Sequence, residues 1–178
     1  MAEFRGAWCH RGYGVKGWSW EESARRLKES GFTAVMPNVV NASTAWFPSG
    51  SLEMPAEVRG GRDFLAECVA ASRRHGLECH PWISCFRLDD NVSAGRVRAL
   101  RETNRLQIDI AGNVNDQWLC PTNAANRRQI LGVVAAMLSD YPVDGIHLDF
   151  VRYPGQQFCF CPHCRQAFRK EMGGRMDD

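Results

Sequence analysis

Four apolar runs, each separated from the next by an amphipathic segment, constrain the fold of this chain more than any other feature of its sequence. Continuous apolar strands that alternate with helices are typical of a parallel sheet whose faces are covered by the helices. The sequence therefore predicts an α/β fold of the β-α-β-α-β-α-β-α type. The expected strands are 4–10, 32–40, 77–86 and 143–151, and the expected helices are 19–31, 62–76, 123–141 and 161–173.

Local signals support these helices. Ser19 is a good N-cap residue, Glu22 three positions later completes a capping box, and Gly31 suits the position after the helix end. In the third helix, apolar residues recur with the spacing of one helical face. These residues are Ile130, Val133, Val134, Met137 and Leu138. The connection 87–119 is long, and we expect a short helix near residues 94–102 within it.

Length and composition exclude several classes of protein. The 178 residues suit one domain, and a net charge of +2 argues against a dedicated nucleic-acid-binding protein, which needs a concentrated basic face. No run of about 18 apolar residues predicts a membrane span. The N-terminus has no charged-then-apolar signal pattern. The expectation is a cytoplasmic protein without membrane contact, and a trimmed secreted parent is the open alternative.

Polar and aromatic residues cluster where the expected strands end. They are His10, Asn38, Asn41, His80, Trp82, His147, Asp149, Arg152 and Tyr153. In (β/α) barrels the active site lies at the face formed by the carboxyl ends of the strands. A complete barrel has about eight units and about 250 residues. Because this chain has about four units, residues 1–178 are predicted to form a single TIM-barrel-type domain, the N-terminal half of a full or truncated barrel.

Five stretches occur in an order that resembles a known family. They are "FRGAWCH", "GFTAVMPNVV", "GLECHPWIS", "WLCPTNAANRRQI" and "YPVDGIHLDFVRYP", and they resemble the glycosyl hydrolase-like family 10 barrels. The resemblance implies a TIM-barrel fold and hydrolysis of O-glycosyl bonds in an oligo- or polysaccharide. It also implies that the acidic residue ending the fourth strand, Asp149, is the catalytic acid/base.

Glycoside hydrolysis typically needs a second carboxylate across the scissile bond. No other expected strand ends in one. The acidic residues that follow the third strand or lie in the long connection are Asp89, Asp90, Asp109 and Asp116, and the pattern favours none of them. In similar barrels the second carboxylate comes from later strands, so we expect catalysis by the isolated chain to be impaired. The alternative for Asp149 is a structural acid that pairs with Arg152 or caps the loop that follows.

The spacing of other polar residues predicts substrate contacts. His147 lies two positions before Asp149, so on a strand both point to the same face. His80 and Trp82 are likewise two apart, and a flat ring suits the apolar face of a sugar. The alternative is a packing role, in which His80 and Trp82 fill the barrel interior. The further candidates for substrate contact are Asn38, Arg152 and Tyr153.

The motif C-x-C-x-x-C, formed by Cys159, Cys161 and Cys164, predicts a metal site. A structural zinc takes four ligands in a closed tetrahedron, and the fourth is His163 or Cys120. The layout "CPTNAANR" followed by "CFCPHCRQAF" resembles the glycoside hydrolase family 42 β-galactosidases, which implies Cys120 and a structural zinc. Free thiols and disulfides are the alternatives. We expect the remaining cysteines to behave as small buried hydrophobic residues.

Two classes of function stay open. One is a glycoside hydrolase-like catalytic domain, and the other is a non-catalytic carbohydrate-binding or self-associating half-barrel held by zinc. A twofold pair of halves would complete eight strands and place Asp149 of each chain in one interior. No organic cofactor is expected, because the sequence lacks G-x-G-x-x-G after its first strand and "GYGVKG" lacks the ending of a P-loop.

Overall fold

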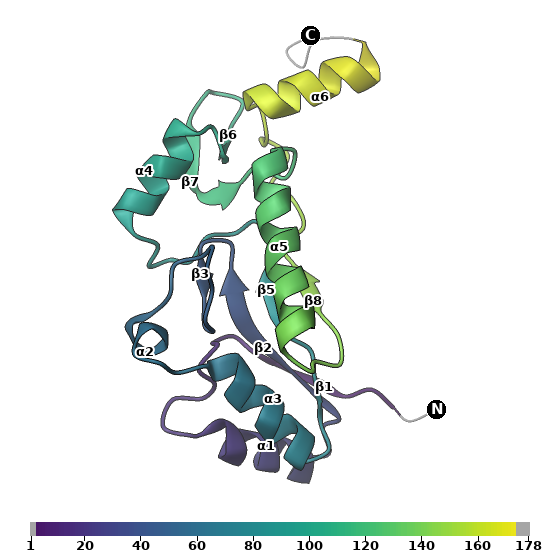
Figure 1. Cartoon of the computed structure of the whole chain (residues 1–178). Helices are drawn as coiled ribbons and strands as arrows, with labels where there is room; N and C mark the ends of the chain where they lie inside the picture. The colour runs from purple at the N-terminus through teal and green to yellow at the C-terminus, as the bar shows by residue number, and fades with distance from the viewer. Residues whose placement is uncertain (1–2, 174–178) are drawn as a thin grey trace.

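The computed structural model describes residues 3–173, and its centre is an open parallel sheet (Figure 1). In this sheet β1 lies beside β2, β2 beside β5, and β5 beside β8. Its strands are β1 (Gly6–Cys9), β2 (Ala34–Asn41), β5 (Trp82–Ser84) and β8 (His147–Asp149). All of these pairings are parallel. The predicted parallel α/β sheet is confirmed, and within the described residues it does not close into a barrel.

The register of the sheet brings the strand ends together. Asn38 pairs with Trp82, Trp82 pairs with His147, and Ser84 pairs with Asp149. The carboxyl ends of parallel strands share one edge of a sheet, so polar residues from separate parts of the chain meet there. This edge positions the candidate site.

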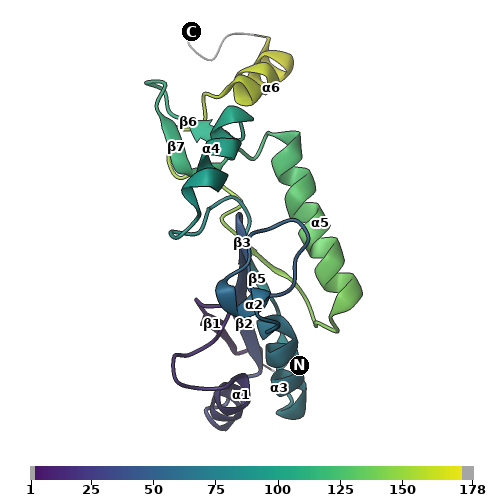
Figure 2. The same cartoon turned by 60° about the vertical axis from the view of Figure 1, so that its left-hand side comes forward.

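The long helices cover the sheet as the periodicity predicts. They are α1 (Trp20–Glu29), α3 (Phe64–Arg74) and α5 (Ala124–Asp140). Figures 1 and 2 show α1 and α3 side by side at one end of the molecule. Buried residues of α5 and β5 belong to the same apolar core. Fully buried side chains such as Leu65, Ile83 and Met137 fill the space between helices and sheet.

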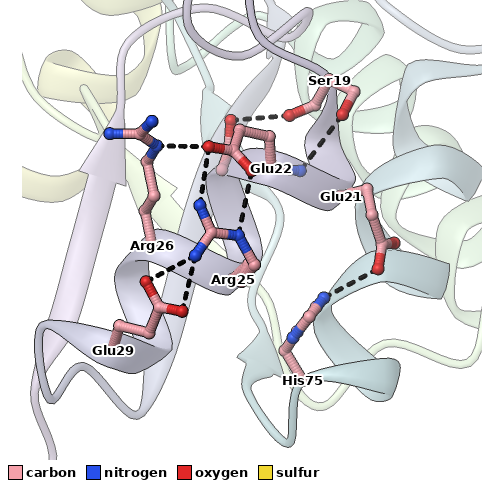
Figure 3. Close-up of polar contacts among 8 residues, drawn as sticks. Ser19, Glu21, Glu22, Arg25, Arg26, Glu29 and His75 are labelled. Carbon is pink, nitrogen blue, oxygen red and sulfur yellow. Dashed lines mark hydrogen bonds and ion pairs between the residues drawn. The ribbon is translucent and has the colours of Figure 1, made fainter.

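The beginning of α1 is capped by Ser19, whose Oγ accepts a hydrogen bond from the Glu22 backbone N–H at 3.1 Å. The Glu22 carboxylate does not complete a capping box. It binds Arg25 at 2.8 Å and Arg26 instead, as Figure 3 shows. Charged partners on the next turn are stronger hydrogen-bond donors than a neutral backbone N–H. These bonds, with that to Arg25 first, lower the pKa of Glu22 to about 2.

A second set of contacts joins α1 to α3. Glu21 accepts a hydrogen bond from His75 Nε2 at 2.8 Å (Figure 3) and pairs with Arg74 at 2.8 Å. His75 is the C-cap residue of α3, so the start of one helix is tied to the end of the other. Exposed ion pairs contribute little each, and the buried apolar face carries most of the stability of this helix pair.

The third predicted strand is interrupted. It forms β4 (Glu78–Cys79), which pairs with β2, and then β5. His80 and Pro81 lie between them outside the regular ladder. Proline has no N–H to donate, so it breaks a strand at this point.

The connection 87–119 holds more structure than expected. The predicted short helix is present as α4 (Ala94–Glu102), and it is followed by an antiparallel pair, β6 (Leu106–Ile108) and β7 (Val114–Leu119). A turn closed by Asp109 and Asn113 joins the pair, with Gly112 at a φ of 89°. The loop after β2 holds two short elements, β3 (Thr44–Ala45) and α2 (Ala56–Arg59).

The last helix, α6 (Pro162–Met172), begins close to the predicted residue. Figures 1 and 2 show it beyond β6 and β7, away from the parallel sheet. It therefore leaves the outer face of β8 uncovered, and Leu148 is 53% exposed. Within residues 3–173, no helix has both the length and the apolar character needed to cross a membrane.

Candidate functional site

A cleft of about 650 Å³ lies at the carboxyl ends of the parallel strands. The four strands β1, β2, β5 and β8 all contribute to it: Trp8 comes from β1, Asn38 from β2, Trp82 from β5, and His147 with Asp149 from β8. The cleft thus collects side chains that are more than 100 residues apart in the chain.

Asp149 is held by two donors. The indole Nε1 of Trp82 donates to Oδ2 at 3.1 Å, and the backbone N–H of Phe150 donates to Oδ1 at 2.6 Å. Phe150 has a φ of 52°, a left-handed conformation that costs a bulky residue energy and is often found at functional sites. The carboxylate therefore has a fixed orientation in the cleft.

Arg152 does not form an ion pair with Asp149, whereas the bond from the Phe150 backbone N–H agrees with the other structural alternative, a cap on the following loop. Its guanidinium lies 5.2 Å from the ring centre of Phe150 and 5.5 Å from that of Trp118. Within residues 3–173, Asp149 makes no ion pair. The carboxylate is thus free to meet a ligand.

Aromatic and imidazole rings surround this carboxylate. The His10 ring centre is 4.9 Å from that of Trp82, and the Trp8 ring is 5.9 Å from that of His147. Trp82 is nearly buried, whereas Trp8 is 62% exposed. Trp8 consequently offers a broad ring face to a ligand, while Trp82 acts mainly as support.

The other predicted site residues divide between the cleft and its surroundings. Asn38 lines the cleft and donates from Nδ2 to Ser84 Oγ at 3.1 Å. His80 lies elsewhere: its Nε2 contacts Glu78 at 2.8 Å and its ring meets Phe4. Tyr153 contacts the cysteine cluster, with its hydroxyl 3.5 Å from Cys164 Sγ.

Several residues of the cleft were not singled out by the sequence interpretation. Ser84 lies two positions after Trp82, so the period of a strand could have identified it. Phe150 could not have been found in this way, because its conformation breaks that period.

Asp89 and Asp90, which follow the third strand, line the same cleft as Asp149. Asp90 pairs with Arg87 at 2.7 Å and its side chain is 72% exposed. Asp89 accepts hydrogen bonds from Asn41 Nδ2 at 3.0 Å and from the Asn91 backbone N–H at 2.8 Å. Of the two, Asp89 has the more fixed carboxylate.

The remaining acidic candidates lie on the β6–β7 pair. Asp109 binds Asn113 in the turn, and Asp116 pairs with Arg101 at 2.6 Å. Neither of them lines the cleft that holds Asp149.

A second cavity of about 670 Å³ continues from the first. The two share lining residues, among them His10, Asn41 and Asp89, so they form one groove. The second part runs under the loop after β2 and ends near Trp46 and Met54. Such a groove has room for a ligand larger than a single small ring.

Four cysteine side chains gather beside this edge of the sheet. The sulfur atoms of Cys120, Cys159, Cys161 and Cys164 all lie within 4.8 Å of one another, and all four residues are buried. Cys120 Sγ is 3.3 Å from Cys161 Sγ and 3.5 Å from Cys164 Sγ. None is in a disulfide.

These distances suit a tetrahedral metal ion. A Zn–S bond of about 2.3 Å places the sulfurs of a tetrahedron about 3.8 Å apart, close to the observed spacing. The Ile108 backbone N–H donates to Cys159 Sγ at 3.4 Å, as expected for a thiolate ligand. His163 instead contacts Asn123 at 3.0 Å. The geometry therefore favours Cys120 as the fourth ligand, and hydrogen bonds with Cys159 and Cys161 lower its pKa to about 7.

The sequence profile of the family described as Glycosyl hydrolase-like 10 matches residues 12–176. The chain belongs to this family. A curated relative, "Glycosyl hydrolase DigH" of Escherichia coli (strain K12), is 26% identical in an alignment of 149 residues that covers 74% of this chain and 34% of that protein. The chain thus spans about a third of the length of the curated relatives it matches.

Solved structures show the same fold. A β-galactosidase from the psychrophilic Marinomonas ef1 superposes with a TM-score of 0.65 at 16% identity, covering 94% of this chain and 25% of that one. A β-galactosidase from the haloarchaeon Halorubrum lacusprofundi superposes with a TM-score of 0.60 at 21% identity, covering 96% and 24%. At these identities the likeness concerns the fold alone. It supports a partial (β/α) barrel.

Proposed function

We propose that this chain is a glycoside hydrolase-like domain in which Asp149 is the catalytic acid/base. One observation carries the proposal. In a member of the Glycosyl hydrolase-like 10 family, a carboxylate that makes no ion pair within residues 3–173 ends β8 and lines a cleft with aromatic rings. An acid/base has to reach the glycosidic oxygen and to hold one orientation. The bonds from Trp82 and Phe150 provide that orientation.

We propose Asp89 as the second carboxylate. It shares the cleft with Asp149, lies at the junction of both cavities, and is held by Asn41 and the Asn91 backbone. A retaining enzyme needs its carboxyl groups about 5–5.5 Å apart and an inverting one about 6.5–9.5 Å. This assignment departs from similar barrels, in which later strands supply the partner.

The groove supports an oligo- or polysaccharide as the substrate. The exposed ring of Trp8 provides a flat surface for the apolar face of a sugar, and His147 beside it adds a hydrogen-bonding edge. Asn41 and Asn91 line both cavities and suit sugar hydroxyls. We retain His147, Trp82 and Asn38 as residues of the substrate site. His80, Arg152 and Tyr153 are assigned to structural contacts.

We propose that Cys120, Cys159, Cys161 and Cys164 hold a structural zinc ion. Four thiolates leave no open position on the metal, so it takes no part in the reaction. The ion would join the end of β7 to the loop after β8 and to the first turn of α6. This fixes the segment that follows Asp149.

The test is the release of reducing ends from chito- and cello-oligosaccharides. We expect Asp149→Asn and Asp89→Asn to lower the rate at least about a hundredfold, since general acid/base catalysis contributes that much. Asp116→Asn is the matched control because Asp116 pairs with Arg101 outside the cleft. Binding of these sugars by the wild type without cleavage would instead favour a non-catalytic carbohydrate-binding module.

A second proposal concerns self-association. Within residues 3–173, β1 and β8 are edge strands, and apolar side chains near them are exposed: Trp8 by 62%, Leu148 by 53% and Val151 by 60%. A twofold pair that joins β8 of one chain to β1 of the other would complete eight parallel strands. Light scattering tests this, because a dimer mass is expected and a monomer mass would contradict it.

A further inference from the structure

Two arginine side chains meet at Gln129, and neither has an acidic partner within residues 3–173. Arg96 of α4 donates from Nη2 to Gln129 Oε1 at 3.1 Å, and Arg105, just before β6, donates from Nη2 to the same oxygen at 2.7 Å. Gln129 is on α5 and its Nε2 donates to Ala42 O at 2.6 Å. One neutral oxygen is therefore shared by two cationic groups.

The charge of this pair is not compensated by the part of the chain that the structure describes. Neither Arg96 nor Arg105 takes part in an ion pair within residues 3–173. Both side chains are half-buried, and Arg96 Nε is buried without an acceptor. Burial, together with the charge of Arg96, lowers the pKa of Arg105. Buried charges in proteins are normally paired, because desolvation without a partner is costly.

The pair is also held in place rather than mobile. Arg105 Nε donates to Asn126 Oδ1 at 2.6 Å, and Asn126 Nδ2 donates to the Arg105 carbonyl at 2.8 Å. Asn126 is fully buried. A rigid, planar guanidinium suits an oxyanion that can accept two parallel hydrogen bonds.

We propose that Arg96 and Arg105 form a binding site for a small oxyanion, a phosphate or carboxylate group. The anion accepts hydrogen bonds from the guanidinium groups of both residues. The site is separate from the sugar cleft and does not depend on the proposed hydrolase activity. Its occupation ties α4 to α5, and the loop that enters α4 carries Asp89, so the anion stiffens one wall of the cleft.

The experiment titrates the protein with inorganic phosphate and, in a second series, with acetate, both at an ionic strength held constant with sodium chloride. The readout is the NMR signal of each arginine Nε–H. We expect saturable shifts of the Arg96 and Arg105 signals. Saturation by phosphate alone assigns the site to phosphate groups, and saturation by acetate alone assigns it to carboxylates.

Variants separate this site from general charge effects. Arg96→Gln is expected to weaken binding about tenfold or more, because a charge-assisted bond is lost. Arg105→Lys keeps the charge but removes the planar guanidinium group, and it is expected to weaken anion binding as well. Arg98→Gln is the matched control, since Arg98 is exposed on the same helix, and it should bind within about twofold of the wild type. The proposal is overturned if the Arg96 signal shows no saturation, or if R96Q binds as R98Q does.

Discussion

Trp82 Nε1 donates a hydrogen bond to Asp149 Oδ2 at 3.1 Å, which links two neighbouring strands of the sheet across the candidate site. Trp82 is only 6% exposed, so its indole ring cannot swing away from the carboxylate. The His10 and His147 rings contact it on either side, at 4.9 and 6.1 Å between ring centres. A buried support of this kind holds a carboxylate in a single orientation.

Trp82→Phe keeps an aromatic ring but removes the N–H donor. We expect the free energy of unfolding to fall by about 1.5 kcal/mol, the value typical of a hydrogen bond to a charged group. Urea denaturation measures it. Combining Trp82→Phe with Asp149→Asn in a double-mutant cycle should give a coupling energy of about 1 kcal/mol. A coupling near zero would show that the bond contributes nothing to stability.

The cysteine cluster predicts about one zinc ion per chain in protein purified without chelator. Cys161→Ser should abolish metal binding and lower the free energy of unfolding by more than about 3 kcal/mol, because metal binding and folding are coupled. Cys9→Ser is the matched control, since Cys9 lies outside the cluster. Metal analysis with thermal unfolding is the measurement, and a wild-type content far below one ion would refute a zinc site.

The ion pairs of α1 predict that the stability of the folded state changes with pH only in the acidic range. The pKa of Glu22 is lowered from 4.5 to about 2, first by its hydrogen bond with Arg25. A carboxyl pKa that is lower in the folded state stabilises that state at pH values above the pKa of the unfolded chain. This stabilisation is lost as the pH falls from about 4.5 towards 2. Carboxyl NMR titration measures the shift. Because Glu22 is partly exposed to solvent, about 0.5 M salt should reduce the shift. A titration near 4.5 at low salt would contradict the pairing.

Adjacent residues on α5 test how its faces are arranged. Met137 is fully buried and Leu138 is 57% exposed. Met137→Ala leaves a cavity in the core and is expected to cost about 3 kcal/mol. Leu138→Ala should stay within about 0.5 kcal/mol of the wild type. Equal losses in urea denaturation would mean that α5 is rotated from the orientation described.

The alternation of strands and helices, with the positions of the long helices, could be predicted from periodicity because each helix has one apolar face. The place of Asp149 at the end of β8 followed from the same pattern. His80 could not be placed by the two-residue period, because Pro81 interrupts the strand between His80 and Trp82. Arg152 and Tyr153 do not lie on the face of the sheet that the sequence predicted for them, because Phe150 before them has a left-handed backbone conformation.

The β6–β7 pair was missed for a different reason. β6 is short, and β7 has the polar stretch Asn115–Gln117 directly after Val114, so the sequence lacks the apolar alternation of a typical strand. Tertiary contacts hold the pair instead: the Gln107 side chain is fully buried and donates to the Leu119 carbonyl at 3.1 Å. The four cysteines, by contrast, could be grouped from their spacing, although only the fold brings Cys120 to the other three.

The most direct test of the central claim is the rate of reducing-end release from chito- and cello-oligosaccharides by the wild type and by Asp149→Asn, with sugar binding measured for both. The account predicts that the two proteins bind alike and that the variant is at least about a hundredfold slower. Equal rates for the two proteins, or binding by the wild type without any cleavage, would contradict the assignment of Asp149 as the catalytic acid/base of this chain.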